Sequence, residues 1–187
     1  MHEEGVESAV FESKRDLPRF IGDILDFHLT LLVDQNPRTD PINEEDIEWV
    51  YQHFTTFDRL AANSEVFRFA LEAAIDWRYA KDVRAAIARL WSGIEAIFGV
   101  TSELVYRISL LSASLLEPRG EKRKAKFEAI KKLYGIRSKA VHGESLSEEI
   151  LSFAMNDSSR LLRDLLLLTI EKGHVLGLDD FDEAIFF

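Results

Sequence analysis

Arg137 and His142 stand five residues apart in the segment RSKAVH and have side chains suited to acting on a phosphate. A guanidinium offsets negative charge on a phosphate, and an imidazole moves protons near neutral pH, so the pair is suited to cleaving a phosphodiester. The same spacing also fits a histidine that caps a helix beside a salt-bridged arginine. From these residues alone, both interpretations stay open.

The segment from Glu117 to Lys139, which leads to this pair, is strongly basic. It holds nine Lys and Arg residues against three Glu residues, a local charge of +6 in a chain whose formal net charge is −10. This contrast is typical of an electrostatic footprint for a phosphate backbone, although lysines on a solvated helix face give the same pattern. The candidate phosphate contacts are Arg119, Lys122, Lys124, Lys126, Lys131, Lys132 and Lys139.

A helix must position the pair, because apolar residues recur at helical spacing up to Tyr134 and Arg137 continues the same stripe. We therefore expect Arg137 to face the packed or interfacial side. In a continuous helix His142 would point about 140° away from Arg137, so the two converge only if the helix ends between them. Gly143 suits the position that ends the helix, which leaves His142 in the last turn, near the negative helix end.

Helical spacing of apolar residues extends through most of the chain, and strand-like alternation is nearly absent. An apolar element is expected from Leu17 to Val33. Six helices are predicted after it. The first runs from the N-cap Asn43 to about residue 62, the second from Asn63-Ser64 toward Trp77, and the third over about 80–98 with Gly99 as the stop. The fourth runs from Thr101 or Ser102 to about 116, the fifth from Pro118 to about Val141, and the sixth starts at a capping box of Ser145 and Glu148.

These elements predict an all-α bundle of at least five helices around one core. The expected core is Ile87, Trp91, Ile94, Phe98, Ile130, Leu161 and Leu165, with Phe67, Leu71, Ile75, Ile150, Ala154 and Leu168 continuing the stripes. Residues 165–170 are apolar all round, which places that helix at the centre of the bundle or in contact with a second subunit. We divide the chain into a partly ordered segment 1–40, a helical domain 41–173 and an acidic, aromatic tail 174–187.

Composition excludes several classes of function. Cysteine is absent, so the chain has no disulfides or thiolate metal sites. The acidic N-terminus does not fit a signal peptide, and the longest apolar stretch falls short of the roughly 20 residues of a membrane span. The other histidines lack paired metal-ligand spacing, and nucleotide-binding and hydrolase glycine motifs are absent. We expect a cytoplasmic protein without metal, cofactor or membrane partner.

Three segments in order, WSGIEAIFG (91–99), SELVYRISLLSASLL (102–116) and KKLYGIRSKAVHG (131–143), resemble the HEPN superfamily and its Apea-like branch. The resemblance covers roughly residues 67–168. It implies an all-α, HEPN-like bundle with a four-helix core, here with additional N-terminal helices, that is commonly dimeric. Many members are metal-independent ribonucleases with an Arg-x(4–6)-His motif, and others are toxins, antitoxins or binders of RNA and nucleotides.

Arg137 and His142 match that motif, so the resemblance implies that they are the catalytic residues. Glu95 matches an acidic residue of the family that helps hold the Arg, although a simple salt bridge is the equal alternative. Ser138 follows the Arg, where the family often has Asn, Asp or His. The implied activity is endoribonuclease cleavage by 2′-hydroxyl attack at a homodimer cleft, in a defence or stress system, with the basic residues binding RNA.

Two alternatives stay open. The first is a non-catalytic HEPN module that binds RNA, a nucleotide or a protein partner through the same cleft. The second is a structural dimerisation domain cut from a larger protein.

Overall fold

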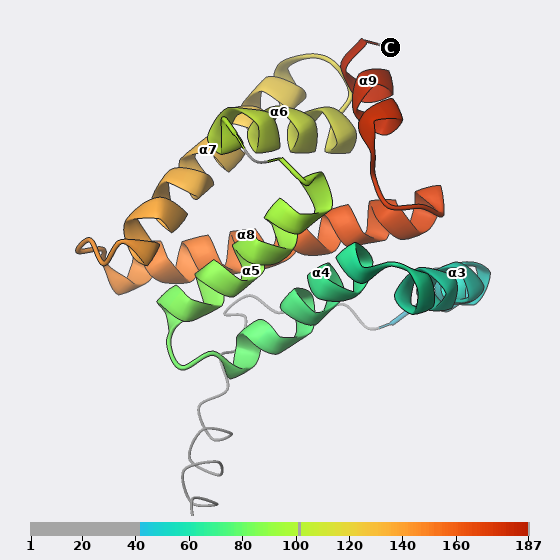
Figure 1. The fold of residues 1–187 in the computed structure, drawn as a ribbon, viewed down its shortest axis with the longest axis horizontal. Helices are drawn as coiled ribbons and strands as arrows, with labels where there is room; N and C mark the ends of the chain where they lie inside the picture. Colours follow the sequence, from blue (N-terminus) through green and yellow to red (C-terminus); the bar gives the residue numbers. More distant parts are fainter. Residues whose placement is uncertain (1–41, 101, 187) are drawn as a thin grey trace, which may run out of the picture. The chain divides into compact units, whose positions relative to one another are not determined.

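The computed structural model describes residues 42–100 and 102–186, and the regular structure in those two ranges is entirely helical (Figure 1). Its elements are α3 (Glu44–Asn63), α4 (Glu65–Asp76), the short 3₁₀ helix η2 (Trp77–Tyr79), α5 (Val83–Phe98), α6 (Leu104–Leu116), α7 (Glu121–Val141), α8 (Glu148–Lys172) and α9 (Leu178–Phe186). The expected all-α bundle is confirmed. The segment 1–40, with the apolar element expected over 17–33, lies outside the described residues.

Side-chain caps begin the first two of these helices where the sequence predicts them. The Asn43 side chain accepts a hydrogen bond from the Asp46 amide at 2.9 Å, and the Asp46 carboxylate accepts one from the Asn43 amide at 3.1 Å. Ser64 caps α4 through the Phe67 amide at 3.1 Å. Each cap satisfies an amide that has no partner inside its helix.

Two predicted helix starts are wrong by one or two residues. Helix α6 begins after Glu103, which has a φ of 51° and makes no side-chain cap, so Ser102 lies before the helix. The alternative cap, Thr101, lies outside the described residues. The cap of α8 is Ser147, which accepts from the Ile150 amide at 3.3 Å, and not Ser145. Ser145 and Ser147 both precede acidic residues, so local chemistry does not choose between them.

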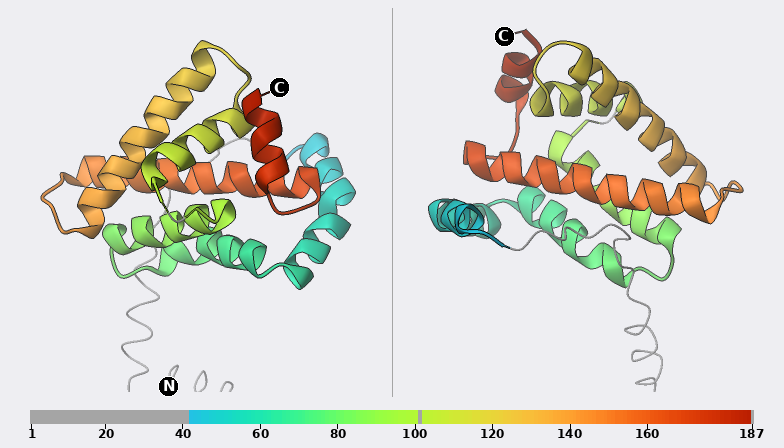
Figure 2. Two further views of the ribbon diagram at one scale, coloured as in Figure 1. Left: turned by 45° about the horizontal axis from the view of Figure 1, so that its top comes forward. Right: turned by 180° about the vertical axis from the view of Figure 1, so that it is seen from behind.

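Helix α8 is the central element, because it packs against α3, α4, α5, α6 and α7. In Figure 2, α8 crosses the bundle while α6 and α7 lie side by side, joined by the turn at Pro118. All seven residues of the expected core are buried: Ile87, Trp91, Ile94, Phe98, Ile130, Leu161 and Leu165. Ile75 and Ile150 were expected to extend the core stripes, but they are 53% and 41% exposed. Ile75 lies on a different side of α4 from the buried Phe67, Ala70 and Ala73, and Ile150 lies in the first turn of α8.

The apolar run 165–170 is covered by the bundle itself. Leu165, Leu166, Thr169 and Ile170 are buried, and only Leu167 is 37% exposed. A second subunit is therefore not needed to cover this run, and it gives no support to a dimer. Among the described residues, no helix has the length and hydropathy that crossing a membrane requires.

The helical fold continues past the boundary expected at residue 173. Helix α9 belongs to the same compact unit as the other described helices, and its Phe181 is buried against Phe98 at 5.7 Å between ring centroids. Arg119, just before α7, and Arg123, in its first turn, donate to carbonyls of α9. The acidic, aromatic tail is thus a packed helix over most of its length.

Asp180 anchors the start of α9. Its buried carboxylate accepts from the Gly177 amide at 2.9 Å and pairs with Lys172 and His174, each at 3.0 Å. Burial alone would raise the pKa of Asp180, but these hydrogen bonds and the nearby positive charge outweigh burial and lower the pKa below its ordinary value.

Gly93 lies where α5 packs closely against α4 and α8. A Cβ placed on Gly93 would lie 2.8 Å from the Ala73 Cβ and 3.1 Å from the Leu162 Cδ2. Both neighbours are fully buried, so neither side chain has free space to move into.

We predict that Gly93→Ala lowers the free energy of unfolding by about 1–3 kcal/mol, because overpacking outweighs the better helix propensity of alanine. The matched control is Gly135→Ala in α7, where a Cβ meets nothing within 4 Å. We expect that control to raise stability by about 0.5–1 kcal/mol. Denaturant unfolding of both variants checks the prediction, and a Gly93→Ala protein as stable as the Gly135→Ala protein would contradict it.

Candidate functional site

An ion pair joins α7 to α5 at the centre of the candidate site. The Arg137 Nη2 lies 3.0 Å from the Glu95 Oε1, and the two side chains are 22% and 25% exposed. The structure therefore brings together two residues that the sequence places 42 positions apart. Because both charges are largely removed from water, loss of either partner would leave the other poorly compensated.

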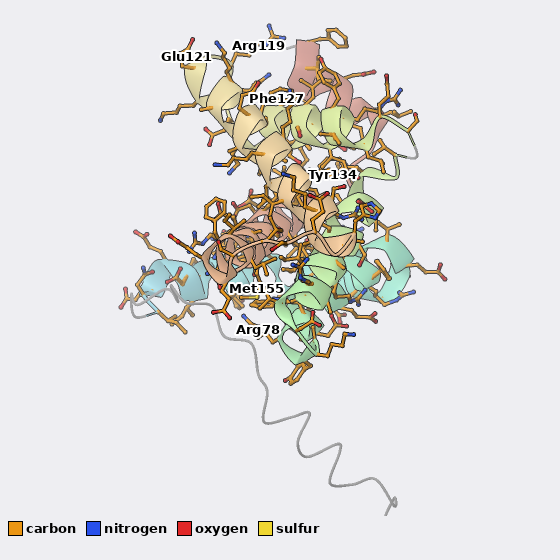
Figure 3. All side chains as sticks on the ribbon, turned by 90° about the vertical axis from the view of Figure 1, so that its left-hand side faces the viewer. Arg78, Arg119, Glu121, Phe127, Tyr134 and Met155 are labelled. Atoms are coloured by element: carbon orange, nitrogen blue, oxygen red, sulfur yellow. The ribbon has the colours of Figure 1, made fainter. Side chains whose placement is uncertain are left out.

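Aromatic rings support the Arg137 side of this pair. The Arg137 guanidinium carbon lies 5.3 Å from the centroid of the Tyr134 ring, and that ring meets Trp91 edge to face at 5.0 Å. The Trp91 Nε1 donates to the Ser158 hydroxyl at 2.9 Å, which fixes the indole against α8. Figure 3 shows Tyr134 where α7 reaches the rest of the bundle, well below Glu121 at the start of the helix. Arg137 therefore follows a tightly packed part of α7.

The guanidinium retains donors that Glu95 does not use. The Arg137 Nε is buried and has no hydrogen-bond partner among the residues described by the structure. A guanidinium has five N–H donors in a planar fork that matches carboxylate or phosphate oxygens. The Glu95 Oε1 is likewise buried without a hydrogen-bond partner among the described residues, so its contact with Arg137 is an ion pair and not a hydrogen bond.

The environment of Arg137 also affects the Tyr134 phenol. Burial raises the pKa of Tyr134 above its ordinary value. The negative charge and hydrogen bonding of Glu95 add to the rise in pKa, while the positive charge of Arg137 acts in the opposite direction. The pKa of Tyr134 therefore depends on both members of the Glu95–Arg137 pair.

His142 stands at the C-terminal end of α7 and is exposed. The helix remains regular through Val141, and His142 itself, with φ −82° and ψ 4°, has left the helical conformation. The rotation of about 140° between Arg137 and His142 therefore persists, and the helix does not end early enough to bring them together. Within one chain, His142 faces solvent while Arg137 faces α5.

Gly143 ends the helix as the sequence predicts. It has a φ of 77°, a left-handed conformation that favours glycine. The Gly143 amide donates to the Ala140 carbonyl at 3.3 Å and the Glu144 amide to the Lys139 carbonyl at 3.0 Å, the hydrogen bonds of a Schellman motif. His142 is therefore presented on a defined turn.

Four of the seven basic candidates share the exposed side of α7 with His142. Lys124, Lys131 and His142 fall close to one line along the helix at its period of about 3.6 residues, and Lys132 and Lys139 lie beside that line. All of these side chains are exposed. We call these four lysines and His142 the basic line of α7.

The other three basic candidates lie apart from this line. Lys122 is exposed on another side of α7. Lys126 is half-buried and borders a hollow of about 200 Å³ between α7 and α8, which Asp157 and Asp164 also line. The Arg119 guanidinium donates to the Ile185 carbonyl, so it also holds α9.

Arg84 is a residue of this region that sequence reasoning missed. Its guanidinium donates to the Ala140 and Glu144 carbonyls, on both sides of His142. No local pattern connects Arg84 with residues 56 and 60 positions later, so only the fold shows this contact.

Ser138 is half-buried, and its carbonyl accepts from the His142 amide at 3.0 Å. Over the described part of the chain, no group of three or more His, Asp or Glu residues is arranged to hold a metal ion.

Comparison with known proteins finds no matching family model, curated protein or solved structure.

We predict that one of the four phenols in the chain ionises at unusually high pH and that Tyr134→Phe removes this step from an alkaline absorbance titration. The unfolded phenol, with a pKa of about 10, ionises first. The contribution of Tyr134 to stability is therefore complete below that pH and is lost as the pH rises through the pKa in the folded state. Tyr106→Phe, which removes an exposed phenol, should leave the high-pH step in place. A wild-type titration without such a step, in protein shown to be folded by circular dichroism, would contradict the prediction.

Proposed function

We propose that this chain is a metal-independent endoribonuclease of the HEPN type. The observation that supports it most is the exposed His142 at the end of a line of exposed lysines, close in sequence to the half-buried Arg137 guanidinium. The basic line would hold a ribose-phosphate backbone through its charges, without reading bases. The resemblance of three segments to the HEPN superfamily supports the same function.

The chemistry requires a base, an acid and a positive charge. A His142 imidazole takes the proton of a ribose 2′-hydroxyl, and the 2′-oxygen forms a bond to the adjacent phosphorus. The Arg137 guanidinium stabilises the negative charge that develops on the phosphoryl oxygens. The bond from phosphorus to the 5′-oxygen then breaks, and that oxygen takes a proton from a second imidazole in its protonated form. The products are a 2′,3′-cyclic phosphate and a 5′-hydroxyl.

A second copy of the chain would supply the second imidazole. Each chain carries one His142, and its side chain points away from its own Arg137. Two α7 ends related by a two-fold axis would place two imidazoles and two guanidinium groups around one cleft. The proposed homodimer is therefore part of the mechanism.

The alternative is a non-catalytic module that binds RNA, a nucleotide or a protein partner at the same place. The Glu95–Arg137 ion pair favours this alternative, because the carboxylate already compensates part of the charge that a transition state would need. Binding without cleavage would identify this function.

We predict that His142→Ala lowers the cleavage rate of a fluorescent RNA by about 10²- to 10⁴-fold, through loss of proton transfer. Arg137→Ala should remove detectable cleavage through loss of charge stabilisation. His53→Ala, which removes a histidine from α3, is the control and should cleave like wild type. All assays contain EDTA and equal concentrations of folded protein. Equal rates for wild type and His142→Ala would contradict the assignment, and binding without cleavage by wild type would favour the non-catalytic module.

We further predict that the double variant Lys124→Glu/Lys131→Glu weakens binding of a non-cleavable 2′-O-methyl RNA and flattens its salt dependence. For a single strand, each phosphate that the protein no longer neutralises should reduce the steepness of log K against log salt by about 0.7, so the double variant should show a reduction of about 1.4. The control Lys81→Glu/Arg163→Glu makes the same change in net charge at exposed positions outside α7. Equal slopes for the two double variants would show that only net charge matters.

A further inference from the structure

Arg84 connects the start of α5 to the end of α7. Its Nη1 donates to the Ala140 carbonyl at 2.8 Å, and its Nη2 donates to the Glu144 carbonyl at 2.7 Å. These carbonyls belong to the residues two before and two after His142. One planar guanidinium therefore spans the turn that presents His142.

The contact suits the electrostatics of a helix end. The last carbonyls of a helix lack partners within the helix and carry partial negative charge, so a cation there is stabilising. Hydrogen bonds from a charged donor are also stronger than neutral ones. The Ala140 carbonyl accepts both from Arg84 and from the Gly143 amide, so Arg84 reinforces the Schellman motif itself.

Side chains of α5 thus contact α7 at Arg137 and at the turn around His142, the two residues assigned to the proposed chemistry. Glu95, in the last turn of α5, pairs with Arg137, while Arg84, in its first turn, holds the turn around His142. The Asp82 side chain caps α5 by accepting from the Ala85 amide at 2.8 Å, which secures the turn that carries Arg84. One rigid helix can therefore set the spacing between a guanidinium and an imidazole that α7 alone leaves on different sides.

We propose that Arg84 is the positioning residue for His142, an inference that rests on the proposed ribonuclease function. It acts through the backbone, by fixing the turn from Ala140 to Glu144, and it does not touch the RNA. Misplacement of a catalytic group by about 1 Å can cost on the order of 10²-fold in rate, so this support is part of the catalytic apparatus.

The test compares Arg84→Gln with Arg89→Gln. Arg89 lies on the same helix and makes two hydrogen bonds to Asp76, at 2.8 and 2.9 Å, away from α7. Amide hydrogen exchange is measured at His142, Gly143 and Glu144, together with kcat and KM for RNA in EDTA. We expect Arg84→Gln to speed exchange at these three amides and to lower kcat by about 10- to 100-fold with KM nearly unchanged. Arg84→Lys, which cannot span both carbonyls, should fall between Arg84→Gln and wild type, and Arg89→Gln should resemble wild type.

Unchanged exchange at the three amides in Arg84→Gln would overturn the proposal, whatever the activity. Faster exchange with an unchanged kcat would also overturn it, because the turn would then be irrelevant to the chemistry. Wild-type protein that does not cleave RNA would instead overturn the ribonuclease function. The exchange data would still decide whether Arg84 holds the turn.

Discussion

A guanidinium that is largely removed from water must be paired, and this requirement ties α7 to α5 at Arg137. Glu95 supplies the charge, Tyr134 lies under the guanidinium, and Trp91 links the tyrosine to Ser158 of α8. Three helices are thus held together around one cation. The same packing leaves the Arg137 Nε and the Glu95 Oε1 buried and without a hydrogen-bond partner among the described residues.

Much of the helical architecture could be predicted, because the core residues repeat at helical spacing and the caps are local. Trp91, Ile94 and Phe98 follow one face of a helix that ends at Gly99, and all three are buried. The predictions that were wrong concern a helix cap for which two nearby residues are equally suitable, and the burial of residues that depends on how other helices pack. Ser145 and Ser147 are equivalent as caps, and Ile75 is exposed because the other helices pack on the side of α4 that carries Phe67, Ala70 and Ala73.

The candidate site was less predictable, because its essential contacts join distant segments. The apolar stripe through Tyr134 correctly placed Arg137 on the packed side of its helix, and Gly143 correctly marked the helix end. The contact of Glu95 with Arg137 was expected only through the family resemblance. The contact of Arg84 with the carbonyls around His142 had no signal in the sequence, because the partners are backbone atoms that any residue would provide. The lysines divide into a line with His142 and others apart from it only once the extent of α7 is known.

The most direct test of the account is cleavage of a DNA strand that contains a single ribonucleotide, in EDTA, with analysis of the product ends. Attack by the neighbouring 2′-hydroxyl predicts one cut, directly 3′ of the ribonucleotide, with a 2′,3′-cyclic phosphate on one fragment and a 5′-hydroxyl on the other. An all-deoxy strand should stay intact. Cleavage of the all-deoxy strand, cuts elsewhere in the chimeric strand, or an intact chimeric strand would contradict the account.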